Sequence, residues 1–218
     1  MQFQGFSPET FDFLWGIRLN NNRDWFEAHK EEYLEHLYRP MQALGALLWE
    51  PFRDVAGMRC KVSRIYRDMR MPQPHGPYKE SLWISLRQDA YYWGMHPCLY
   101  FEIRPEAAEY GFVLWKPQPI TMERFRADLE ANPDRFLELA ARCEAASGMT
   151  LTGDQYKRRK PCSDARAERF MSNKNLYCGR EIAPGEELFT ADLADTVRSG
   201  LEALLPLYEY FISLENMA

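Results

Sequence analysis

Three β-prone runs lie in the middle of the chain, two of them with alternating apolar and polar residues, and the loops between them limit the possible folds. In residues 82–87 (LWISLR) and 99–104 (LYFEIR), every second residue is an apolar residue that faces the same side of the strand. Residues 111–115 (GFVLW) form a third β-prone run. Alternation with a period of two is typical of a half-buried strand. The loops are too short for the crossover helices of a parallel sheet, so the sequence predicts a mainly antiparallel sheet.

Helical patterns precede this central region. Ser7 followed by Pro8 predicts the start of a helix that runs to about Leu19. Asp24, with Glu27 three residues later, predicts a capping box that opens a second helix. A ligand pocket in the same region could use Asn21, Asn22, Trp25 and Phe26, although helix capping and core packing explain these residues better.

Helical patterns also follow the central region. Helices are expected at about 121–131, capped by Thr121, and at about 133–148. Residues 175–178 are interpreted as a brief edge strand, and a final amphipathic helix starts at Thr190 with a kink or restart at Pro206. The sequence therefore predicts one α+β domain over residues 1–218, with a central antiparallel sheet flanked by N-terminal and C-terminal helices.

Basic residues are concentrated in two blocks of an acidic chain. The formal net charge is −5, yet residues 59–80 carry +4 and residues 153–180 carry +5. The overall charge argues against broad attraction to nucleic acid, whereas the blocks indicate local cationic patches. The two blocks are therefore the leading candidates for binding sites.

The first block combines guanidinium groups with a tyrosine and a lysine. Its candidate ligand-binding residues are Arg64, Arg67, Asp68, Arg70, Tyr78 and Lys79. Guanidinium forks suit phosphate or carboxylate groups, which favours an anionic small molecule as the partner. If the segment is extended, Arg67 points away from the face that Arg64 and Arg70 share, so convergence requires a bulge or turn. The alternative is that Asp68 pairs with a neighbouring arginine and anchors the strand.

Glu102 and Arg104 share the polar face of the second predicted strand with Tyr100. Across the sheet this face could meet Ser85 and Arg87. A solvated sheet face explains the alternation. If helices enclose the face, Glu102 becomes the candidate general acid or base and Arg104 a further ligand-binding residue, because a buried carboxylate beside arginines has a tunable pKa.

The second basic block contains the run QYKRRK at 155–160. Lys157 and Arg158 are candidates for binding phosphate, and Tyr156 could stack on a base. A solvated loop is the simpler interpretation, because runs of like charge usually lie in water. Nucleic acid is therefore not the favoured partner.

Three segments carry a resemblance to a known family: NNNRDWFEAHKEEY at 20–33, RIYRDMRMPQPHGPYK at 64–79 and GDQYKRRKP at 153–161. In these segments the chain resembles the uncharacterised family DUF2461. Met71 stands where the family motif is expected to have Phe, and a single Gly111 replaces a richer glycine run, which argues against a phosphate cradle there. The resemblance implies a shared fold, compartment and location of unusual residues, and it implies no particular reaction.

Cysteine and histidine spacings indicate neither a metal site nor a known catalytic motif. The five cysteines include no C-x-x-C pair, and His29 and His36 lie seven residues apart, too far for a one-turn metal pair. His96 and Cys98 lack an evident third orienting group. Nucleophile elbow, Walker loop, Rossmann fingerprint and HExxH motifs are absent from the sequence. No cofactor is indicated, and whether the protein is an enzyme stays open.

The N-terminal sequence lacks the basic and apolar regions of an export signal, and no window approaches the length of a membrane span. We therefore expect reduced cysteines, a cytoplasmic location and no membrane partner. Three functional hypotheses remain: binding of an anionic small molecule, a structural or protein-interaction role, and binding of nucleic acid. The structural role predicts individually paired arginines with no cavity between them, and the nucleic-acid role predicts that both basic blocks join into one strip. No pattern in the sequence predicts the oligomeric state.

Overall fold

A five-stranded sheet forms the centre of the molecule in the computed structural model, which describes residues 2–68, 70, 75–89 and 93–217. Its strands are β1 (Met58–Val62), β2 (Leu82–Gln88), β3 (Cys98–Ile103), β4 (Ala108–Leu114) and β5 (Leu176–Ile182). They lie in the order β1-β2-β3-β4-β5, and every neighbouring pair is antiparallel. The predicted antiparallel sheet is confirmed.

Helices precede the sheet in the chain, lie between its strands and follow its last strand. On the N-terminal side they are α1 (Pro8–Leu19), α2 (Arg23–Ala28), α3 (Lys30–Glu32), the π-helix η1 (Tyr33–Tyr38), α4 (Arg39–Trp49) and the short η2 (Glu50–Phe52). The later ones are η3 (Trp93–Met95), α5 (Pro119–Ala131), α6 (Pro133–Ser147), η4 (Ala165–Ala167), α7 (Glu168–Met171), η5 (Glu186–Phe189) and α8 (Leu193–Glu215). The α+β class with flanking N-terminal and C-terminal helices is confirmed.

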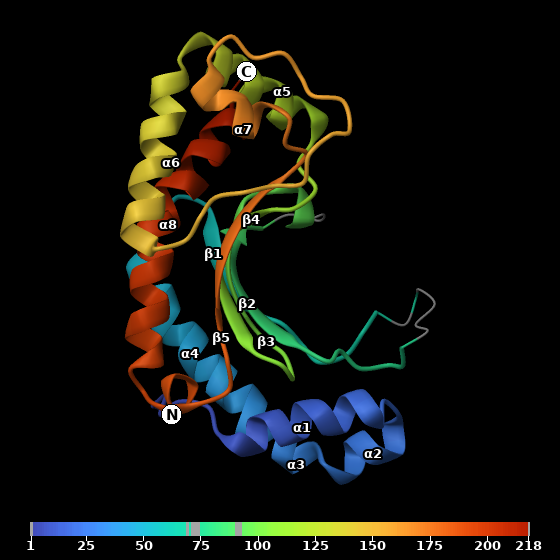
Figure 1. Cartoon of the computed structure of the whole chain (residues 1–218). Coiled ribbons are helices and arrows are strands. Elements are labelled where there is room, and N and C mark those ends of the chain that lie inside the picture. Colours follow the sequence, from blue (N-terminus) through green and yellow to red (C-terminus); the bar gives the residue numbers. More distant parts are fainter. Residues whose placement is uncertain (1, 69, 71–74, 90–92, 218) are drawn as a thin grey trace.

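The sheet is curved, and its two faces have different surroundings (Figure 1). Helices α4 and α8 pack on the convex face, and α6 packs on α8 in an outer layer. The concave face stays open, with α1 to α3 beyond one end of it and α5 and α7 beyond the other. The functional residues must therefore be sought on the uncovered face and at its ends.

Burial of alternate side chains on the convex face explains why these runs form strands. Leu82, Ile84 and Leu86 of β2 are buried. Phe112 of β4 stacks on Phe211 of α8 with ring centroids 5.9 Å apart. Burying a large apolar side chain contributes about 1.5–3 kcal/mol, so the period-two pattern and the helical cover stabilise each other.

Several boundaries differ from the sequence-based predictions. The cap of α2 is Asn22, whose side chain accepts a hydrogen bond from the Trp25 N–H at 3.0 Å, so the capping box predicted at Asp24 is wrong. Thr121 lies inside α5, which begins at Pro119, where the ring fixes a helical φ. The predicted edge strand is present and extends to Ile182 because it pairs along the whole of β4.

Pro206 does not restart the final helix. Helix α8 runs from Leu193 to Glu215 with Pro206 inside it. Proline removes one backbone hydrogen bond from a helix, and here the buried side chains Leu204 and Leu207 on either side hold the segment against the core. In the part of the chain that the structure describes, no helix is both long and apolar enough to cross a membrane.

Candidate functional site

The open face of the sheet carries the polar and aromatic residues that alternate with the core positions. Trp83 of β2 lies opposite Glu102 of β3, and Ser85 lies opposite Tyr100. Glu102 in turn lies opposite Glu109 of β4. Antiparallel register therefore gathers side chains from three strands onto one surface. The general acid or base hypothesis for Glu102 required a helical cover, and none of the helices in the described part of the chain lies over this face.

The loop between β1 and β2 folds back on itself and carries the first basic block. The Arg67 N–H donates to the Pro77 carbonyl at 2.8 Å, and the Lys79 N–H donates to the Ile65 carbonyl at 2.7 Å. An isolated bridge pairs Tyr66 with Tyr78. These bonds form the turn that the sequence required for convergence, and they bring Arg67 and Lys79 to the same end of the sheet.

The α1–α2 turn and helix α2 fix the position of this loop. The side-chain amide of Asn21 donates to the Tyr78 carbonyl at 2.9 Å and its side-chain oxygen accepts from the Tyr78 N–H at 3.0 Å. Phe26 of α2 stacks on the Tyr78 ring at 4.2 Å between centroids. Tyr78 is thus a buried anchor for the site, rather than a ligand-facing residue.

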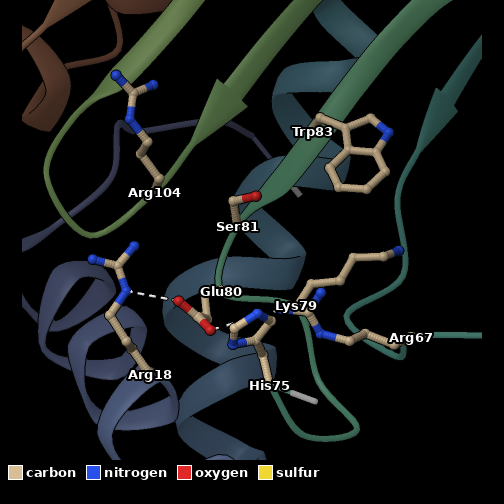
Figure 2. A pocket seen from close by; sticks show the side chains of 8 residues that line it. All are labelled: Arg18, Arg67, His75, Lys79, Glu80, Ser81, Trp83 and Arg104. Atoms are coloured by element: carbon tan, nitrogen blue, oxygen red, sulfur yellow. Dashed lines mark hydrogen bonds and ion pairs between the residues drawn. The ribbon is translucent and has the colours of Figure 1, made fainter. Parts of the chain in front are cut away.

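A charged hollow of about 470 Å³ opens where this loop meets the sheet (Figure 2). Its lining residues are Arg18, Arg67, His75, Lys79, Glu80, Ser81, Trp83 and Arg104. They come from helix α1, from both legs of the loop, from β2 and from the residue that follows β3. We call this the charged hollow.

Each arginine of the charged hollow has a carboxylate partner. Arg18 pairs with Glu80 at 2.8 Å and with Glu106. Arg67 lies 3.7 Å from Glu80, which therefore bridges two guanidinium groups. Arg104 pairs with Glu109 at 3.2 Å and with Glu181. These pairs hold the walls in place and neutralise much of their charge.

Lys79 differs from the arginines. Its ammonium group donates to the Arg64 carbonyl at 2.6 Å and lies 4.5 Å from the centroid of the Trp83 ring. Among the described residues, no carboxylate lies within ion-pair distance of it. Burial lowers the pKa of Lys79, and the positive charges of Arg64 and Arg67 lower it further. The hollow therefore contains a half-buried cation without a compensating anion.

A second hollow of about 380 Å³ adjoins the charged one along the concave face. It is lined by Trp83, Ser85, Cys98, Tyr100, Glu102, Glu109, Val113 and Trp115, and we call it the aromatic hollow. Trp83 lines both hollows, so the two meet at this residue. The Tyr100 hydroxyl donates to Glu109 at 2.7 Å, and burial together with this bond raises the pKa of Tyr100.

The other predicted residues of the first block do not line either hollow. Asp68 accepts hydrogen bonds from the Arg70 guanidinium at 2.7 and 2.9 Å, and these bonds lower the pKa of Asp68 to about 2. Both side chains are exposed. Arg64 contributes its carbonyl to Lys79, and its side chain is exposed as well. Met71, the departure from the expected family motif, lies outside the described residues.

The second basic block forms a separate hollow of about 670 Å³ lined by Tyr156, Lys157, Arg158, Arg159, Lys160, Pro161 and Lys174. Arg159 pairs with Glu168 at 2.7 Å. The ring of Tyr156 has Lys160 at 5.3 Å and Lys174 at 5.5 Å from its centroid. Figure 1 places this segment at the opposite end of the concave face from the loop that carries Lys79, so the two basic blocks do not form one strip.

Sequence patterns missed several residues of the site. Arg18 and Glu80 are 62 positions apart in sequence, and no local pattern links them. Trp83 was recognised only as part of an alternating strand, although a tryptophan on the polar face of a sheet is itself a signal for a binding surface. Glu109 lies in the part of β4 that the sequence did not predict as a strand. Its position opposite Glu102 could therefore not be predicted.

Together these features define a class of protein: an α+β protein whose curved antiparallel sheet is covered by helices on one face and has two adjoining hollows on the other. The chain belongs to the DUF2461 family, described as a conserved hypothetical protein, whose family model matches residues 9–210. None of the curated proteins compared with the chain matches it. Within the described residues, no group of three or more His, Cys, Asp or Glu side chains is arranged to hold a metal ion.

Proposed function

We propose that this protein binds a small anionic molecule in the charged hollow, through a phosphate or carboxylate group that meets Lys79 and Arg67. The observation that carries the proposal is the half-buried Lys79 ammonium without a carboxylate partner among the described residues. Desolvating a cation is costly unless an anion lies nearby. A bound anion would supply the missing partner, and no reaction is assigned to it.

The hollow between the arginines supports this function over a purely structural one. Individually paired arginines are common to both hypotheses, and Arg18, Arg67 and Arg104 are indeed paired. A structural network leaves no room between the pairs, whereas here they surround a hollow of about 470 Å³. Nucleic acid is disfavoured because the two basic blocks lie at opposite ends of the sheet. The cytoplasmic location stays part of this proposal, since small phosphates and organic acids are abundant there.

Replacing Lys79 with methionine tests the proposal. Methionine keeps an unbranched apolar side chain against Trp83 and removes the charge, so the fold is expected to remain. We expect the Kd for inorganic phosphate or citrate, measured by isothermal titration calorimetry, to rise at least about tenfold, which equals about 1.4 kcal/mol. The matched control is Lys30→Met, because Lys30 is an exposed lysine of α3 that pairs with Glu27 at 3.8 Å. Equal affinity of wild type and Lys79→Met, or the absence of any anion binding, would show that the proposal is wrong.

The lowered pKa of Lys79 gives a second test. The ammonium group is fully charged below its pKa and loses its proton as the pH rises, and for Lys79 this happens at a lower pH than for an ordinary lysine. Affinity for inorganic sulfate, whose own charge is constant, is therefore expected to fall as the pH rises through this lowered pKa. Lys79→Arg should keep its charge and bind sulfate with little pH dependence. Parallel pH profiles for the two proteins would contradict a role for the Lys79 proton.

A further inference from the structure

Two side chains of opposite charge, Lys79 and Glu102, lie next to Trp83, and neither has an ion-pair partner among the residues that the structure describes. Lys79 lies over the Trp83 ring on the side of the charged hollow. Glu102, the cross-strand neighbour of Trp83, lines the aromatic hollow. Lys79 lines the charged hollow and Glu102 lines the aromatic hollow, so each charge faces its own hollow.

Glu102 is the uncompensated charge of the aromatic hollow. One of its oxygens accepts a hydrogen bond from the Ser81 hydroxyl at 2.6 Å. No Lys, Arg or His side chain of the described part of the chain pairs with it. Glu109 lies directly opposite Glu102 on β4, and like charges in this position repel each other. Arg104 pairs with Glu109, so the negative charge of Glu102 stays uncompensated among the described residues.

The rest of the aromatic hollow is suited to an organic cation. Trp83, Tyr100 and Trp115 contribute rings, and the lining includes neither lysine nor arginine. An ammonium group over the face of such rings is attracted by the ring quadrupole, most strongly when it is desolvated. The neighbouring carboxylates add direct electrostatic attraction. The two hollows are thus complementary to charges of opposite sign.

We propose that the groove formed by the two hollows takes a zwitterionic small molecule, with its anionic group at Lys79 and its amino or quaternary ammonium group against Glu102 and the surrounding rings. This inference rests on the proposed anion site and adds the chemical class of the ligand. A neutral, hydroxylated ligand satisfies Glu102 with hydrogen bonds but leaves its charge uncompensated. The zwitterion compensates Glu102 and Lys79 at once, which is why the charge distribution favours it.

Matched probes separate these ligands. The test compares ω-aminoalkyl phosphates of increasing chain length, including phosphoethanolamine, with ω-hydroxyalkyl phosphates of the same lengths. Phosphocholine is added as a quaternary ammonium probe. For at least one chain length we expect wild-type protein to bind the amino compound at least about tenfold more tightly than its hydroxyl counterpart. A difference of this size requires the cationic end of the ligand, because the phosphate is common to both.

Two variants test which residue binds each end of the ligand. Glu102→Gln should abolish the preference for the amino compounds and leave affinity for the hydroxyalkyl phosphates within about twofold, a change that corresponds to less than about 0.5 kcal/mol. Lys79→Met should weaken both series. Glu123→Gln is the control, since Glu123 is an exposed carboxylate of α5. The expected pattern is a loss of selectivity in one variant and a loss of affinity in the other.

The outcomes distinguish failure of this inference from failure of the anion site. Equal binding of amino and hydroxyl compounds at every chain length, with both still dependent on Lys79, would overturn the zwitterion and keep the anion site. A preference that persists in Glu102→Gln would also overturn the assignment. If the wild-type protein binds none of the phosphate compounds, both the proposed function and this inference are wrong.

Discussion

Replacing Phe26 with alanine is expected to lower the free energy of unfolding by about 3–5 kcal/mol and to weaken anion binding in the protein that remains folded. Phe26 is fully buried, stacks on Tyr78 at 4.2 Å and contacts Tyr33 at 5.5 Å between ring centroids. The substitution leaves a cavity beside the Tyr78 ring. It therefore removes the packing that positions Tyr78 and Lys79. Urea unfolding measures the first effect, and calorimetric titration with phosphate measures the second.

Phe136→Ala is the matched control for this prediction. Phe136 of α6 is also fully buried and contacts Phe125 at 4.7 Å and Phe170 at 5.0 Å. It lies among the helices outside the sheet, away from the hollows of the concave face. A similar loss of stability is expected with an unchanged Kd for phosphate. If both variants weaken binding equally, the effect is general loosening, and Phe26 has no special role in positioning Lys79.

Replacing Gly111 with alanine is expected to destabilise the sheet by about 3 kcal/mol, the upper part of the range for overpacked positions. A Cβ at Gly111 would lie 2.0 Å from the carbonyl oxygen of Cys178, in the backbone of the neighbouring strand. Because backbone rather than a flexible side chain is in the way, β4 and β5 must move apart. Gly111 pairs with both Tyr100 and Gly179, so the floor of the concave face would be distorted as well.

Gly94→Ala is the control, because an added Cβ there meets no atom of the described residues within 4 Å. Its effect on the free energy of unfolding is expected to be within about 0.5 kcal/mol. Both variants lose the same backbone freedom in the unfolded state, so the difference between them measures the close approach of the strands. Equal stabilities would show that β5 can shift without cost.

The sheet could be predicted from sequence because its signal is local. The alternation at residues 82–87 records which side chains are buried, and the short loops exclude parallel pairing. Helix α1 was predicted with its bounds, 8–19, from a proline at its start and helical spacing. The cap of α2 was misplaced by two residues because Asn22 and Asp24 both suit an N-cap, and only the backbone conformation at Asn22 decides between them.

Only part of the candidate site could be predicted from the sequence. Arg67 and Lys79 were among the predicted binding residues, and they line the charged hollow. Arg64 and Arg70 were grouped with them by sequence proximity, but Arg70 pairs with Asp68 in solvent. The segment, for which an extended strand was one possibility, is a folded-back loop held by Asn21, which is 57 residues from Tyr78. That the whole chain forms one domain stays a prediction.

The amino-acid sequence by itself determined the elements of this protein, the antiparallel pairing and the flanking helices, since periodicity and loop length are properties of neighbouring residues. Only the tertiary structure decided which sheet face stays open and which charges remain uncompensated. The physical reason is that an ion pair depends on distance in space. Arg18, Arg67 and Arg104 meet carboxylates through folding, whereas Lys79 and Glu102 lie beside Trp83 without an ion-pair partner among the described residues.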